Sequence, residues 1–173
     1  LILPSGKFGD AIIDALAARI AAVKIGRWDD DDIFMGPVVS VAAADAALKF
    51  ESELKAAGGT SVVPFERDGA FLRPAMIDVT DATTPDEELF APLLQIIRVG
   101  DLNDAIARAN DTRFGLAAGV ICNDAEVWDF ARPRLRAGIV NWNKPTTGAA
   151  SSLPFGGPGL SGNHRPAAYY AAD

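Results

Sequence analysis

Two residues in this sequence have side chains of the type used in nucleophilic catalysis, Cys122 and the single histidine His164. A catalytic cysteine needs a neighbouring base or positive charge that keeps it as a thiolate. Cys122 instead ends an apolar run, where a cysteine behaves as a small hydrophobic side chain. His164 has neither metal-ligand spacing nor a neighbouring nucleophile to deprotonate. We therefore predict structural roles for both residues.

A glycine-rich segment, 157–162, formally matches the G-x-G-x-x-G pattern of dinucleotide-binding proteins. That pattern directs backbone amides at a pyrophosphate only when it follows a strand and opens a helix. Here no strand precedes the segment, no evident helix follows, and Pro158 lies within it. We predict that these glycines serve close packing or an unusual backbone conformation.

The surrounding region, 143–173, contains many glycines and prolines and leaves little room for regular structure. Long loops of this kind are uncommon in compact domains and are often functional. The sequence therefore places a binding site here, and the preceding elements must position it.

Those elements alternate between helices and strands. Apolar spacing predicts helices at 10–25, 40–57, 102–110 and 124–131, with Asp10 and Ser40 as N-caps of the first two. Strands are predicted at 62–63, 72–79, 94–99, 118–122 and 138–142. The strands are nearly continuous in apolar residues, which suggests burial on both faces, and Pro74 places the second at an edge or bulge. The pattern predicts an α/β fold with a largely parallel sheet flanked by helices.

Composition limits the class of protein. The chain has 173 residues, is 49% hydrophobic and 23% charged, and carries a net charge of -7. The negative charge argues against nucleic-acid partners, which need clustered lysine and arginine. No apolar run approaches the roughly 20 residues that span a bilayer, so we expect no membrane partner. A single cysteine cannot form an internal disulfide, which fits a cytoplasmic protein. The acidic run 29–32 lacks the spacing of a calcium loop and is predicted to be a solvated turn, with no metal site.

Four motifs then resemble those of the aldehyde dehydrogenase superfamily. The segment 85–92, Pro-Asp-Glu-Glu-Leu-Phe-Ala-Pro, resembles its E-E-x-F-G-P signature, with Ala91 in place of the usual glycine. Residues 103–120 resemble a segment that ends in A-N-x-x-x-x-G-L. Residues 137–143, together with 154–157 and 161–162, resemble the substrate-loop signature. With Met-Gly-Pro at 35–37 upstream, the order matches the C-terminal part of the catalytic domain over nearly the whole chain.

The end of the chain narrows the resemblance. Residues 141–157 and 161–173 resemble the succinylglutamate semialdehyde dehydrogenase branch, an enzyme of bacterial arginine catabolism. Asn163, His164 and Pro166 depart from the glycine and glutamate that usually surround the arginine, and this favours the narrower match. The substrate implied is N-succinylglutamate 5-semialdehyde, and the product N-succinylglutamate.

In this family a cysteine thiolate adds to the aldehyde, hydride passes to a nicotinamide cofactor, and water hydrolyses the thioester. The resemblance implies NAD, with NADP not excluded. It also implies that Glu88 hydrogen-bonds the nicotinamide ribose and that Phe90 packs beside the nicotinamide. The implied residues of the substrate pocket are Asn143, Lys144, Thr146, Gly148, Ser151, Phe155 and Arg165. Two hypotheses stay equally open for Lys144 and Arg165. One of them binds the substrate carboxylates, or both are simply exposed charges.

The resemblance also implies that several functional segments of the family lie outside residues 1–173. The nucleophile segment would lie just before Leu1, the general base and the cofactor domain earlier, and the final oligomerisation strand after Asp173. Residues 1–173 are thus expected to be a partial catalytic domain, inactive alone, of a homo-oligomeric parent acting on a small-molecule semialdehyde. Two alternatives stay open, namely a dehydrogenase for another semialdehyde and a free-standing, non-catalytic binding or regulatory module with this fold.

Overall fold

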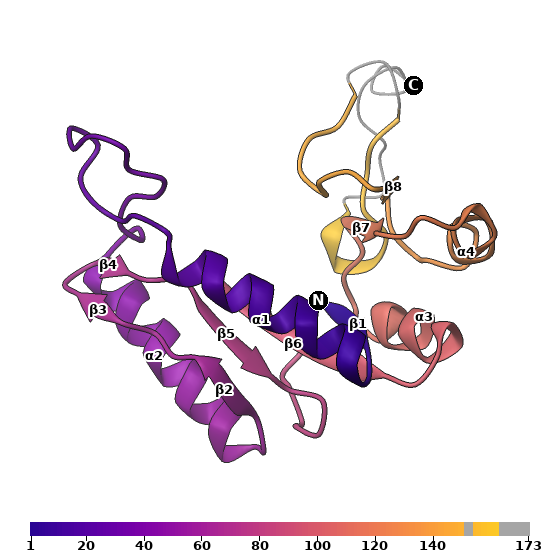
Figure 1. Cartoon of the computed structure of the whole chain (residues 1–173). Helices are drawn as coiled ribbons and strands as arrows, with labels where there is room; N and C mark the ends of the chain where they lie inside the picture. Colours follow the sequence, from indigo (N-terminus) through magenta and orange to yellow (C-terminus); the bar gives the residue numbers. More distant parts are fainter. Residues whose placement is uncertain (151–153, 163–173) are drawn as a thin grey trace. The chain divides into compact units, whose positions relative to one another are not determined.

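The computed structural model describes residues 1–150 and 154–162. The chain divides into two compact units, a first unit of Leu1–Gly100 and a second unit of Asp101–Asp173. The α/β architecture predicted from the sequence is confirmed in the element order (Figure 1).

The first unit is built on a four-stranded sheet in the order β1-β6-β5-β2. β1 and β6 are parallel, β6 and β5 are parallel, and β2 runs antiparallel to β5 at one edge. The sheet is therefore largely parallel, as predicted. The strands are β1 (Ile2–Pro4), β2 (Thr60–Val63), β5 (Ala75–Asp78) and β6 (Leu93–Val99), and a small separate pair is formed by β3 (Arg67–Asp68) and β4 (Phe71–Leu72).

Helix α1 (Lys7–Ala21) starts and ends earlier than predicted. Gly6 takes the N-cap position with φ of 91°, which a glycine adopts without strain, so Asp10 lies inside the first turn and is not the cap. At the other end, the backbone of Lys24 and Gly26 bonds to Phe34 and Met35. This pairing with the returning loop removes residues 24–26 from the helix.

Helix α2 (Val41–Ala56) has the predicted cap, because Ser40 Oγ accepts a hydrogen bond from the Ala43 N–H at 3.1 Å. Two glycines follow the C-terminal end of this helix. Gly58 has φ of 106°, and the Gly59 N–H donates to Leu54 O at 2.8 Å.

The predicted strand 72–79 is two strands separated at Pro74. β4 belongs to the small hairpin, whereas β5 lies between β6 and β2 in the larger sheet. Of the two positions predicted from Pro74, an edge or a bulge, the edge position is thus wrong for β5. The proline precedes the first residue of a central strand, where its missing N–H removes no ladder hydrogen bond.

Alternate residues of β5 pack against opposite helices. Met76 packs with Ile13 of α1 and with Ile96, and α1 is seen crossing β5 and β6 in Figure 1. Ala75 packs in the cluster that contains Ala47 of α2, and Ile77 packs with Leu54 of α2. The first unit therefore has a helix on each face of its sheet, and the predicted burial of both faces is confirmed for β5.

The second unit contains α3 (Leu102–Asn110), β7 (Ala117–Val120), α4 (Ala125–Ala131), β8 (Ile139–Trp142) and a short 3₁₀ turn, η1 (Gly159–Ser161). β7 and β8 form a parallel pair. Asp101 and Asp124 cap α3 and α4 through their carboxylates, so both predicted helices are confirmed. The side chains of β7 and β8 are only partly buried, so the predicted burial of both faces is wrong here. A two-stranded sheet has little packed against it within the described residues.

Candidate active-site segments

Partly buried and exposed side chains alternate at the end of the segment before β6. In the segment 85–92, Leu89 and Ala91 pack against the cluster that contains Leu72 and Ala75. The side chain of Glu88 is exposed, and that of Phe90 is 80% exposed. The segment is fixed at its end because Pro92 O accepts from the Ala75 N–H at 2.9 Å. A large exposed aromatic ring near a carboxylate, on a segment held by partly buried neighbours, is suited to contact a ligand.

In the second unit, Asn143 follows β8 directly and has φ of 52°, which is rare for a residue other than glycine. Its Oδ1 accepts from the Cys122 N–H at 3.0 Å, and its Nδ2 donates to Cys122 O at 2.8 Å. The Asn143 N–H donates to Val120 O at 2.9 Å. The Asn143 side chain thus continues the β7–β8 pairing by one residue and fixes the start of the following loop.

The other predicted pocket residues occupy that loop. Lys144, Thr146 and Gly148 are exposed, and Gly148 has φ of 88°. Phe155 is half-buried and precedes Gly156. Ser151 and Arg165, which were also predicted, lie outside the described residues, as does His164. Glu88 and Phe90 belong to the first unit and the loop residues to the second.

The glycine-rich segment 157–162 is a close-packed turn, as predicted. Gly159 has φ of 61°, and a side-chain carbon on Gly162 would lie 1.7 Å from Gly157 O. The Leu160 N–H donates to Arg113 O at 2.9 Å, and Ser161 Oγ accepts from the Gly115 N–H at 3.1 Å. These glycines permit contact between backbones and do not open a helix that could hold a phosphate.

Cys122 lies beyond β7, and not within the strand as predicted. Its Sγ donates to Asp124 O at 3.3 Å, an arrangement that uses the protonated thiol. Its backbone is bonded to Asn143 on both sides. This geometry agrees with a structural role for Cys122.

A network of charges lies at the carboxyl ends of β5 and β6. Arg98 Nε donates to Asp78 at 2.7 Å and Arg98 Nη1 to Asp10 at 2.5 Å, while Thr80 Oγ1 donates to Asp78 at 2.6 Å. Burial raises the pKa of the Asp78 carboxyl, but the hydrogen bonds from Thr80 and Arg98 outweigh burial and hold this pKa below its ordinary value. The network ties α1 to the sheet.

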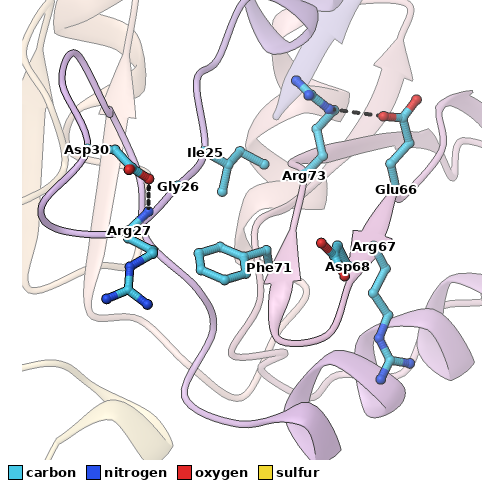
Figure 2. Close-up of a pocket in the computed structure, with 9 residues that line it drawn as sticks. All are labelled: Ile25, Gly26, Arg27, Asp30, Glu66, Arg67, Asp68, Phe71 and Arg73. Atoms are coloured by element: carbon cyan, nitrogen blue, oxygen red, sulfur yellow. Dashed lines mark hydrogen bonds and ion pairs between the residues drawn. The ribbon is translucent and has the colours of Figure 1, made fainter.

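Two grooves in the first unit were not anticipated from the sequence. Figure 2 shows one of them, with the Phe71 ring in its middle and the Arg73–Glu66 ion pair beside it. Its arginines are each paired with an acid, Arg27 with Asp29, Arg67 with Asp45 and Arg73 with Glu66, so little free charge is left for a ligand.

The second groove is apolar and lies between the last turns of α1 and the start of β6. It is lined by Leu16, Ile20, Val23, Ala91 and Leu94, among others. One of these lining residues, Ala91, directly follows Phe90 in the sequence. The helical spacing of its α1 residues is the sequence signal that could have indicated this groove, although the same spacing also describes a core-facing side.

Comparisons with known proteins agree with these motifs. A model of the aldehyde dehydrogenase family matches residues 2–173. The chain is 52% identical over its whole length to the N-succinylglutamate 5-semialdehyde dehydrogenase of Chromobacterium violaceum, and it spans 36% of that relative. Among the described residues, no helix is long and apolar enough to cross a membrane, and no group of three or more His, Cys, Asp or Glu residues could hold a metal.

Solved structures of the same family share the fold. Betaine aldehyde dehydrogenase from Staphylococcus aureus in complex with NAD+ is 28% identical, with a TM-score of 0.87 over 97% of this chain and 35% of its own. The GapN glyceraldehyde-3-phosphate dehydrogenase of Methanocaldococcus jannaschii, complexed with NADP, is 27% identical, with a TM-score of 0.89 over 99% of this chain and 38% of its own.

Proposed function

Because the chain belongs to the aldehyde dehydrogenase family, we propose that it forms a C-terminal part of the catalytic domain of an NAD(P)-dependent semialdehyde dehydrogenase. The proposed substrate is N-succinylglutamate 5-semialdehyde, oxidised to N-succinylglutamate. The observation that carries this substrate is the 52% identity, over the whole chain, to an enzyme named for it. The chain spans about a third of that relative, so the activity is proposed for a longer protein.

Glu88 and Phe90 are proposed to contact the nicotinamide half of the cofactor. The two side chains lie two residues apart on a segment anchored by Leu89 and Ala91, and both are exposed. The Glu88 carboxylate can accept hydrogen bonds from ribose hydroxyls, and the Phe90 ring can pack against a flat heterocycle. When bound, the nicotinamide accepts hydride from the substrate. The anchored segment would limit how far the ring can move, which fits the geometric demands of hydride transfer.

The nucleophile is proposed to come from residues outside this chain. Cys122 is half-buried, its thiol donates to Asp124 O, and its backbone serves the loop after β8. A thiol that donates a hydrogen bond to a carbonyl is not prepared for attack on an aldehyde. The 173 residues alone are therefore expected to be inactive.

Residues 143–150 and Phe155 are proposed to shape the aldehyde pocket, together with the predicted but undescribed Ser151 and Arg165. Asn143 would support this pocket through its bonds to Cys122. Lys144 is exposed at the start of the loop, where an ammonium can bind a carboxylate of the substrate.

The first experiment compares substrates. The intact enzyme that contains this chain is assayed for kcat/KM with succinylglutamate semialdehyde and with succinate semialdehyde, using NAD and then NADP. A higher kcat/KM for succinylglutamate semialdehyde supports the proposal. Equal or reversed preference would assign the protein to another branch of the family, and the absence of any aldehyde oxidation would reject the proposal. Turnover by residues 1–173 alone, with NAD supplied, would show that the nucleophile is in this chain.

The second experiment tests Lys144. Lys144→Ala in the intact enzyme is expected to raise KM for the anionic semialdehyde about tenfold, since a charged hydrogen bond is lost, with KM for NAD unchanged. Lys49→Ala is the matched control because Lys49 lies exposed on α2 and pairs with Glu53. If Lys144→Ala leaves the substrate KM at the control value, Lys144 does not bind the substrate.

A further inference from the structure

The carbonyl of Cys122 receives two side-chain hydrogen bonds. Asn143 Nδ2 donates to it at 2.8 Å and Trp142 Nε1 donates to it at 3.0 Å. Because the Asn143 bond already satisfies this carbonyl, the second donor is not needed to avoid an unsatisfied group. The indole N–H is therefore an additional restraint between the end of β8 and the residue that follows β7.

The orientation of Trp142 is itself fixed by stacking. Its ring lies against Trp128 of α4, with ring centroids 5.5 Å apart and an interplanar angle of 9°. The stack restricts the Trp142 side-chain dihedrals, so that Nε1 stays directed at Cys122 O. These contacts connect α4, β7 and β8 through two partly buried side chains.

The residues that follow β8 make two further contacts, one with β8 and one with β7. Asn141 Nδ2 donates to Pro145 O at 2.7 Å. The Thr146 methyl group lies over Gly119, where a side-chain carbon would approach it to 3.2 Å. Residues 143–146 are thus held by the Asn141 side chain and by the contact of Thr146 with Gly119, although their own side chains are exposed.

We propose that the tryptophan clamp, defined as Trp128, Trp142 and the Cys122 carbonyl, positions residues 143–146 for binding of the anionic part of the substrate. This proposal rests on the proposed function, because it concerns the same loop. Trp128 and Trp142 are positioning residues that do not contact substrate. Loosening the clamp should displace Lys144 and Thr146 and weaken substrate binding, while the cofactor segment at 85–92 is left as it is.

The test uses the substitution Trp142→Phe in the intact enzyme. This substitution removes the Nε1 donor and keeps an aromatic ring at position 142 that can stack on Trp128. Trp28→Phe is the matched control, since Trp28 lies in a loop of the first unit and is 91% exposed. Trp142→Phe is expected to raise KM for the semialdehyde about fivefold, the effect of one lost hydrogen bond. Within the same variant, kcat and KM for NAD should stay within about twofold of the wild type.

Two structural readouts accompany the kinetics. Amide hydrogen exchange of residues 143–150 should be faster in Trp142→Phe than in the control. The exciton signal of the Trp128–Trp142 stack in the far-ultraviolet circular dichroism spectrum should disappear in Trp142→Phe and persist in Trp28→Phe. If Trp142→Phe does not fold, Trp128→Phe is the second variant, because it weakens the stack and keeps the indole donor of Trp142.

The outcomes separate the clamp from the proposed function. Faster exchange with a raised semialdehyde KM supports the clamp. Unchanged exchange, or an unchanged KM despite faster exchange, overturns it. A uniform loss, in which kcat and both KM values worsen together, also overturns it because the stack then only supports folding. If the wild-type enzyme oxidises no semialdehyde, the proposed function fails, and the exchange measurement still decides whether the stack holds residues 143–150.

Discussion

The two units of this chain are stabilised in different ways. In the first unit, Met76, Ile77 and Ile96 are fully buried between a sheet and its two helices. In the second, Ala131 is the single fully buried hydrophobic residue among those described, and side chains such as Asn143 and Trp142 bond to the backbone instead. A unit stabilised by apolar burial can accept small rearrangements of its polar groups. Hydrogen bonds from side chains to the backbone are directional, so they fix the position at which a loop begins. The proposed cofactor segment rests on the former and the proposed substrate loop on the latter.

The largest effect is expected for loss of burial in the first unit. Ile96 is fully buried in β6, so Ile96→Ala should lower the free energy of unfolding by about 3 kcal/mol, from lost burial and a residual cavity. Ile121→Ala is the control in the second unit. Ile121 is 85% exposed, and its truncation should cost less than about 0.5 kcal/mol. Urea denaturation followed by circular dichroism measures both, and equal costs would remove the contrast between the units.

A smaller effect should come from the glycine contacts of the second unit. A side-chain carbon at Gly138 would lie 2.3 Å from Gly156 O, so Gly138→Ala should cost about 2 kcal/mol through overpacking against backbone. Gly36→Ala is the matched substitution in the first unit, where the new carbon meets no atom within 4 Å. Thermal unfolding of both variants would contradict this prediction if Gly138→Ala unfolds at the temperature of Gly36→Ala.

The charge network of the first unit should appear as a dependence of stability on pH. The folded-state pKa of Asp78 is lowered, so its contribution is fully present above the unfolded-state pKa and is lost as pH falls through the folded-state pKa. Asp78→Asn should cost about 1.5 kcal/mol at pH 7, the lower value for a hydrogen bond to a charged group. That cost should shrink in acid.

The control for this network is Asp14→Asn, which changes an exposed carboxylate of α1. Urea denaturation at several pH values gives the difference in unfolding free energy between each variant and the wild type. A cost for Asp78→Asn that does not change between neutral and acidic pH would show that its charge contributes nothing to the network.

The smallest effects should be equal in the two units. Ser40→Ala removes the cap of α2, and Asp101→Ala removes the cap of α3, where the carboxylate accepts from the Asp104 N–H at 2.9 Å. Each substitution should cost about 1 kcal/mol, because capping depends on local geometry and not on burial. Amide hydrogen exchange measures the loss of stability of each helix. A clearly larger loss for Asp101→Ala than for Ser40→Ala would contradict this prediction and show that the second unit depends more on local hydrogen bonds.

Local patterns in the sequence predicted the helices well where the boundary signals are local. The caps at Ser40, Asp101 and Asp124 and the turn at Gly58 depend on a few neighbouring residues, and the structure confirms the helices that they bound. The N-terminal boundary of α1 was wrong because Gly6, and not Asp10, takes the cap position. Its C-terminal boundary was wrong because a segment outside the helix decides it. The backbone of Lys24 bonds to Phe34, and no helical periodicity reports such a partner.

The candidate site shows the same division. Motifs identified Glu88, Phe90 and the loop from Asn143, and a motif is a property of sequence. The Trp128–Trp142 stack carries no motif, since two aromatic residues fourteen positions apart have no fixed relation until α4 and β8 are packed. The apolar groove beside Ala91 likewise needs α1 and β6 to meet.

Sequence alone therefore determined the family, the α/β class, the capped helices and the close-packed glycine turn. Each of these depends on residue identity and on short-range geometry. Tertiary structure decided that β5 is central despite Pro74, that β7 and β8 are only partly buried, and that the Cys122 backbone anchors the loop after β8. These features depend on which segments become neighbours on folding, and that is set by the packing of the whole unit.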